Sequence, residues 1–234
     1  MALAAALYTT VGHAGASAYI ALMALFGIAP EVMRPTALTL NVLVASFTSY
    51  RYLRAGFFKW RTLWPFLIGA VPLAFIGGAT PVPGHLYKVL VGAVLLIASA
   101  RLLWPKDMQS VLEPRQPPIA WGIVAGAGIG LLAGLTGTGG GIFLSPLLLF
   151  LGWSDVRTAS GVVALFILCV SIAGLAGNYT IVQSLPAELP IYAVAVLGGA
   201  LVGTTLGIRL PSPAILKALG VVLLIAGLKL IGVY

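Results

Sequence analysis

The residues best placed to do chemistry form a glycine cluster in the second half of the chain. Its members are Gly137, Gly139, Gly140 and Gly141, all inside an otherwise apolar region. Each glycine costs a helix about 1 kcal/mol relative to alanine, so we expect a helix to break here. In a bilayer such a break persists only where it lines a cavity or is buried in protein. It exposes N–H groups at a helix N-terminus, which favours anion binding, and Thr136 and Thr138 add hydroxyl donors.

A second, less glycine-rich break lies near the start of the chain, and its polar and glycine residues are Gly12, His13, Gly15 and Ser17. A neutral His13 could hydrogen-bond an anion, a protonated one could attract an anion or carry a proton, and a purely structural histidine is the alternative. Paired broken helices at matching positions of two repeats point to the binding site of a transporter. We therefore expect both breaks to bind substrate.

Two other uses of glycine compete with this interpretation. Small residues let membrane helices pack closely, and we assign that role to Gly126, Gly130, Gly134, Gly198, Gly199 and Gly203. A phosphate-binding loop would need a lysine and a hydroxyl residue after the glycines, and the cluster at 137–141 lacks them.

Polar residues near the breaks are the next candidates. Asn41 lies in an apolar run, so we expect it to face the protein interior, with or without touching substrate. Glu31 and Asp155 occupy matching positions after short helices, where they could relay protons; Asp155 could instead cap the helix that follows. Arg34 and Arg157 could pair with these acids or attract an anion, so we treat all four as coupling or gating candidates.

Composition identifies the solvent around these residues. The chain has 234 residues, of which 60% are hydrophobic and 8% charged, and its mean hydropathy is +1.09. A soluble domain carries about 25% charged residues, so most of this surface must face lipid. We predict an all-α, polytopic membrane protein, because apolar segments recur along the whole chain between short breaks rich in glycine and proline.

The two halves of the chain resemble each other. Pro65 matches Pro190, the run 78–80 matches 203–205, and Val-Leu-Leu-Ile-Ala at 94–98 recurs at 222–226. The ordered series predicts a duplication of about five helical segments per half, with the broken short helices meeting near the midplane. We expect a first repeat at 1–104, a cytoplasmic linker at 105–118 and a second repeat at 119–234.

The distribution of basic residues favours a second copy that is inverted relative to the first. A repeat with an odd number of segments reverses the membrane orientation of the copy that follows it. One side of the membrane then receives ten basic residues: Arg51, Arg54, Lys59, Arg61, Arg101, Lys106, Arg115, Arg157, Arg209 and Lys217. The other side receives three, which are Arg34, Lys88 and Lys229, whereas parallel halves would give a split of eight against five. The positive-inside rule therefore predicts that both termini lie outside the cytoplasm.

The motifs also carry a family resemblance. The run GLLAGLTGTGGGIFLSPLLLFLG at 130–152, with VGHAGASAYIALMALFG at 11–27 and EVMRPTALTLN at 31–41, resembles the sulfite exporter TauE/SafE family of membrane transporters. The resemblance implies a multi-pass protein of a bacterial-type inner membrane that moves sulfite, sulfonates or other organosulfur anions, with proton coupling often assumed. The chain departs from the family pattern at His13-Ala14-Gly15-Ala16, where a side chain could replace backbone donors.

We therefore predict a secondary transporter for a small anion, with an anion channel as the alternative. An intramembrane enzyme is disfavoured, because Cys169, His13 and His85 and the five acids form no recognisable catalytic or metal-binding pattern. We expect no cofactor, no metal and no nucleic acid as partner, only membrane lipid and the small anion. The sequence leaves a homodimer open.

Overall fold

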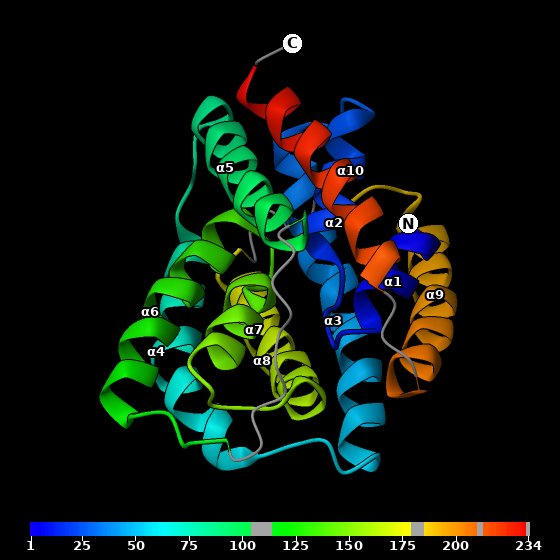
Figure 1. The fold of residues 1–234 in the computed structure, drawn as a ribbon. Helices are drawn as coiled ribbons and strands as arrows, with labels where there is room; N and C mark the ends of the chain where they lie inside the picture. The colour runs from blue at the N-terminus through cyan, green and yellow to red at the C-terminus, as the bar shows by residue number, and fades with distance from the viewer. Residues whose placement is uncertain (104–113, 179–184, 210–212, 233–234) are drawn as a thin grey trace.

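The computed structural model describes residues 1–103, 114–178, 185–209 and 213–232, so most of the predicted linker at 105–118 lies outside the described residues. The described chain is all-α, as predicted, and Figure 1 shows its ten helices. They are α1 (Ala2–Thr9), α2 (Ala16–Leu25), α3 (Pro30–Arg54), α4 (Trp60–Ala79), α5 (Gly84–Leu103), α6 (Ile119–Thr136), α7 (Gly141–Phe150), α8 (Val156–Gly177), α9 (Leu189–Arg209) and α10 (Pro213–Ile231).

The helices follow the apolar runs, and local signals set their ends. Pro30 occupies the first turn of α3, where its missing N–H costs nothing. Asp155 caps α8 by accepting from the N–H groups of Arg157 (3.1 Å) and Thr158 (3.0 Å). The cap that the sequence suggested for Asp155 is therefore present, and the polar breaks between apolar runs are the connections between helices.

Within the part of the chain that the structure describes, four helices are long and apolar enough to cross a membrane: Trp60–Ala79, Ile119–Thr136, Val156–Gly177 and Leu189–Leu206. All four carry exposed large apolar side chains, and Trp121 (67% exposed), Ile191 (70%) and Val194 (74%) are examples. An outer surface of this kind suits lipid rather than water. The chain is a multi-pass membrane protein.

Successive helices alternate in direction, as Figure 1 shows. The short pair α1 and α2 folds back on itself across the break at 10–15, and α6 and α7 fold back across the break at 137–140 from the opposite end of the molecule. The helix α4 packs against α6 and α8, and α9 packs against α1 and α3. In addition, α3 packs on α8 and α5 packs on α10.

Glycines allow the closest of these contacts. A Cβ at Gly126, Gly130 or Gly134 of α6 would overlap the backbone of Phe66, Ala70 or Ala74 of α4, and a Cβ at Gly199 or Gly203 of α9 would overlap Ala2 or Ala6 of α1. The packing role expected for these five glycines is confirmed. The same expectation was wrong for Gly198, because a Cβ there meets nothing within 4 Å.

Neighbouring glycines of α6 give a matched test of this packing. A Cβ at Gly130 would overlap the Ala70 backbone, so we expect Gly130→Ala to destabilise the protein by about 1–3 kcal/mol. Gly128 has open space around its Cβ position, so Gly128→Ala should be neutral or stabilising by up to about 1 kcal/mol. Thermal unfolding in detergent measures both, and equal melting temperatures for the two variants would contradict the packing account.

Candidate functional site

The two helix breaks meet in the buried centre of the molecule. His13 of the first break lies with Nε2 3.0 Å from the carbonyl oxygen of Gly141 in the second, 128 positions away in sequence. Both residues line a small central cavity of about 10 Å³, together with Tyr8, Ala14, Gly15, Ala16, Ser17, Asn41, Thr138, Ile142 and Ile167. A volume of this size holds about one water molecule. Six of the predicted substrate residues therefore line this one small cavity, namely His13, Gly15, Ser17, Asn41, Thr138 and Gly141.

Asn41 joins the two breaks from the side of α3. Its Oδ1 accepts from the N–H of Ala16 (3.2 Å), the first residue of α2, and its Nδ2 donates to Ser171 Oγ (3.3 Å) on α8. A Cβ on Gly139 would overlap Asn41 Nδ2, so the second break runs directly against this amide. Asn41 is fully buried, as expected from its apolar run.

Glycine is required at the turns that start the short helices. Gly15 precedes α2 with φ of 101°, and Gly140 precedes α7 with φ of 74°. These left-handed conformations are cheap for glycine and strained for other residues. The first hydrogen bond within α7 runs from the N–H of Phe143 to Gly140 O (3.1 Å), so the N–H groups of Gly141 and Ile142 lie outside the helical ladder.

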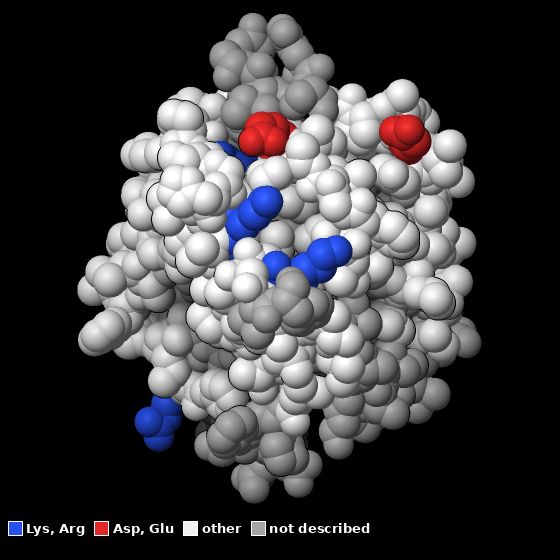
Figure 2. Space-filling view, turned by 90° about the horizontal axis from the view of Figure 1, so that it is seen from above, with Lys and Arg blue, Asp and Glu red and all other residues white. Residues whose placement is uncertain are grey.

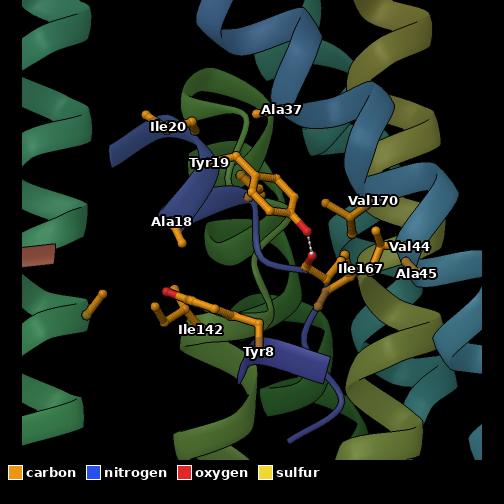
Figure 3. Close-up of a cluster of buried hydrophobic side chains, with 14 of the residues drawn as sticks. Tyr8, Ala18, Tyr19, Ile20, Ala37, Val44, Ala45, Ile142, Ile167 and Val170 are labelled. Carbon is orange, nitrogen blue, oxygen red and sulfur yellow. Dashed lines mark hydrogen bonds between the residues drawn. The ribbon is translucent and has the colours of Figure 1, made fainter. Parts of the chain in front are cut away.

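Hydroxyl groups of two tyrosines hold the first break, as Figure 3 shows for Tyr19. The Tyr19 hydroxyl donates to Ala14 O (2.6 Å), and Tyr8 shares a hydrogen bond of 2.7 Å with Ser17 Oγ. Tyr8 also meets the His13 ring edge-on, with centroids 6.1 Å apart. Polar side chains therefore support the first break, whereas the second consists mainly of backbone.

The hydrogen bonds of His13 depend on its protonation. Nδ1 lies 3.0 Å from Val11 O, and Nε2 lies 3.0 Å from Gly141 O. A carbonyl can only accept, so both contacts are hydrogen bonds when both ring nitrogens carry a proton, and a neutral ring keeps only one of them. Loss of a proton from His13 therefore removes one of its two hydrogen bonds to main-chain carbonyls of the breaks.

A larger cavity of about 210 Å³ lies at the end of the molecule where α3 begins, lined by Pro30, Glu31, Arg34, Pro81, Val82, Tyr87 and Asn178. We call it the vestibule. Figure 2 views this end of the molecule, where most side chains are uncharged and basic side chains gather near the middle. The vestibule and the central cavity share no lining residue.

Two buried polar side chains face the vestibule with unused hydrogen-bonding capacity. Asn178 is 1% exposed, and neither its Nδ2 nor its Oδ1 has a partner. Arg34 is 5% exposed and donates to the carbonyls of Gly77, Gly78 and Thr80 at the end of α4, while its Nε has no partner. Buried polar groups without partners are costly, so such a pair in a cavity points to a ligand.

A thin layer separates the vestibule from the central cavity. Tyr87 of the vestibule donates to Thr136 O (3.0 Å), and Thr136 Oγ1 lies 2.9 Å from Oγ1 of Thr138, which lines the central cavity. Gly137 packs against the backbone of Arg34, where an added Cβ would lie 3.1 Å from Arg34 O. Gly12 approaches the backbone of Ser160 on α8 in the same way. The predicted residues Thr136, Gly137 and Gly12 therefore line neither cavity, and Thr136 and Gly137 lie in the layer between the two.

The four coupling candidates separate in the structure. Arg34 hydrogen-bonds main-chain carbonyls and not Glu31, which is exposed at the rim of the vestibule. Arg157 lies over the ring of Phe57 at 5.5 Å, and Asp155 caps α8. Burial acts to raise the pKa of Asp155, but the N–H groups of Thr158 and Arg157 outweigh it, so the pKa lies below its usual value. Neither Arg34 nor Arg157 therefore forms the side-chain ion pair with its neighbouring acid that the sequence suggested.

Sequence reasoning missed Tyr8 and Tyr87 and left Asn178 out of the site. Two tyrosines in apolar runs look like ordinary membrane aromatics. Tyr8 lies four residues before Gly12, close to the first break, and that spacing was the available signal. Asn178 follows the last residue of α8, where a polar residue is common, and only the cavity reveals its role.

A substitution at the second break tests the site against a matched control. Gly140→Val places a branched side chain at positive φ, where even a Cβ would lie 2.8 Å from Ile129 Cγ2. We expect a folded, monodisperse protein that no longer transports. Gly56→Val adds the same strain at φ of 78° but meets nothing within 4 Å, so it should transport normally. Normal flux in Gly140→Val would exclude this position from the site.

Comparisons with known proteins agree with the architecture. The family model described as "Sulfite exporter TauE/SafE" matches residues 1–230. The chain is 36% identical over 228 residues to the "Probable membrane transporter protein y4hK" of Sinorhizobium fredii (strain NBRC 101917 / NGR234), covering 96% of this chain and 92% of that protein. No solved structure matches the chain. The chain belongs to the TauE/SafE family of membrane transporters and is not an enzyme.

Proposed function

We propose that this protein is a secondary transporter for a small anion, a sulfur oxyanion or organosulfonate, bound where the two helix breaks meet. The observation that carries the proposal is the contact between His13 and Gly141, which joins the breaks in the buried centre. The free N–H groups of Gly141 and Ile142, at the positive end of α7, supply donors for an anion. The sulfur chemistry rests on the family alone.

The site lies between two inverted repeats in this proposal. Packing supports it, because Gly77 of α4 approaches the backbone of Leu131 on α6, and Gly203 of α9 approaches Ala6 on α1. Those pairs are related by shifts of 126 and 125 positions, from 77 to 203 and from 6 to 131, close to the offset of the sequence repeat. The alternating helix directions in Figure 1 fit the same relation. We place the repeats at 1–104 and 119–234.

The anion enters through the vestibule. A buried guanidinium with a free Nε and an amide with free donor and acceptor atoms can replace part of the water around an anion. Tyr87, Thr136 and Thr138 then form the layer that must open for the anion to reach the central cavity. The positive-inside rule assigns the side of the protein with more basic residues to the cytoplasm. In this orientation the vestibule faces the non-cytoplasmic side, and both termini lie on that side.

Transport by alternating access requires the two repeats to differ in conformation, and the packing of helices that correspond in this proposal supports such a difference. In one half α2 packs against α10. The corresponding helices of the other half, α7 and α5, flank an apolar gap of about 320 Å³ between Ile97 and Ala98 on one side and Phe143 and Pro146 on the other. Exchanging these arrangements between the repeats is the simplest route to the opposite-facing state.

His13 is our candidate for proton coupling. Its two carbonyl contacts are both satisfied only in the doubly protonated form, so proton loss releases one contact at the junction of the breaks. Glu31, exposed at the rim of the vestibule, is a candidate for proton entry. The runner-up function is an anion channel that uses the same residues without coupling.

Flux in proteoliposomes tests the function and separates these alternatives. Thermal-shift screening with sulfite, thiosulfate, sulfoacetate and taurine selects the substrate. We expect uptake of that anion to accumulate against its own gradient when a proton gradient is imposed. Flux that only dissipates the anion gradient would indicate a channel, and absence of flux for every anion would contradict the proposal.

A charge placed in the vestibule tests the route. Two unit charges about 10 Å apart at an effective dielectric constant of about 20 repel by about 1.7 kcal/mol, so Asn178→Asp should raise KM for the anion more than tenfold. Asn178→Leu has similar size and no charge, and it should have a smaller effect. Equal KM values for the two variants would show that the anion does not pass Asn178.

A further inference from the structure

A second polar cavity, of about 340 Å³, lies at the opposite end of the molecule from the vestibule. It lies between the first turn of α4, residues 114–116 before α6, and the turn between α7 and α8. Its lining includes Lys59, Arg61 and Arg115, with Trp60 and Trp153. It shares no lining residue with the vestibule or the central cavity, so it is a separate cavity.

The walls of this basic cavity are fixed to one another. The N–H of Arg115 donates to Gly152 O (3.0 Å), which joins the segment before α6 to the turn after α7. Trp153 packs on Phe66 of α4 with ring centroids 6.1 Å apart. Thr62 of α4 is 3% exposed, and its N–H donates to Lys59 O (3.1 Å). The cavity is therefore a preformed feature of three chain segments.

The positive charge of this basic cavity favours the binding of an anion. Three cationic side chains face one cavity, and no acidic side chain is among the described residues that line it. Like charges gathered in this way repel one another, and a bound anion with several oxygen atoms relieves the repulsion. Arginine in particular pairs with phosphate oxygens through two parallel N–H groups.

Its surroundings indicate that the anion is attached to a lipid. The cavity lies at the start of α4 and just before α6, whose outer faces carry exposed Ile68 (52%), Ile76 (52%), Trp121 (67%) and Val124 (65%). Trp60 is 57% exposed at the cavity itself, as expected for a residue at the membrane interface. A ligand bound here would have its head in a basic cavity and its tails along an apolar surface.

We propose that this cavity binds the phosphodiester headgroup of an anionic phospholipid such as phosphatidylglycerol. Basic cavities between membrane helices on the cytoplasmic side suit such headgroups. The bound lipid fixes the start of α4 to the turn after α7 and so supports the hairpin that carries the second break. This inference rests on the basic side chains and the packing, and it does not depend on the transported substrate.

Native mass spectrometry and thermal unfolding of the full chain in detergent test the proposal. Phosphatidylglycerol should bind and raise the melting temperature, whereas phosphatidylcholine with the same acyl chains should not. Arg61→Gln/Arg115→Gln removes two of the three charges, and the expected loss of lipid affinity is roughly thirtyfold. Arg51→Gln/Arg54→Gln removes the same charge from the last turn of α3, outside the cavity lining, and should bind phosphatidylglycerol as the unmodified protein does.

Three results would overturn the proposal. These are equal binding of the two phospholipids, equal loss in both double variants, and stabilisation by inorganic phosphate that matches phosphatidylglycerol at equal concentration. The last would assign the cavity to a free anion. If Arg61→Gln/Arg115→Gln does not fold, Arg115→Gln alone supplies the comparison, with an expected loss of about fivefold. Lipid binding is measured without flux, so failure here leaves the proposed transport function standing.

Discussion

A backbone N–H or C=O without a partner costs several kcal/mol in the hydrocarbon core of a bilayer, and this protein interrupts two helix pairs in its interior. One contact between the two breaks and several side chains around the first break satisfy some of these groups. His13 contacts the carbonyl of Gly141, Asn41 accepts from the first N–H of α2, and tyrosine hydroxyls bind Ala14 and Ser17. Loss of the His13 side chain would leave the Gly141 carbonyl without this partner.

The two breaks are built from different kinds of polar groups. The first relies on side chains, and its histidine can change its hydrogen bonds by gaining or losing a proton. The second relies on backbone groups at glycines whose missing side chains make room for Asn41 and Ile167. In our account the second break supplies donors for an anion and the first responds to protons, so their contact couples the two events.

The sequence predicted the helices and both breaks, because apolar runs and clusters of glycine and proline act locally. It also predicted close helix packing at Gly126, Gly130 and Gly134, which lie against α4 in the structure. It could not predict which residues meet across the fold. The partner of His13 lies 128 positions away, and Arg34 binds carbonyls at the end of α4 rather than the neighbouring Glu31. Gly198 shares the spacing of its neighbours but faces open space, which only the packing of α9 reveals.

The central claim is that an anion binds where the two breaks meet, and locating a bound sulfonate tests it most directly. Anomalous diffraction from crystals grown with a bromine-labelled alkanesulfonate would show the position of the ligand. Our account predicts sulfonate oxygens within hydrogen-bonding distance of the N–H groups of Gly141 and Ile142 and of the His13 ring, in a central cavity wider than the present 10 Å³. Full occupancy elsewhere, with the junction of His13 and Gly141 intact and empty, would contradict it.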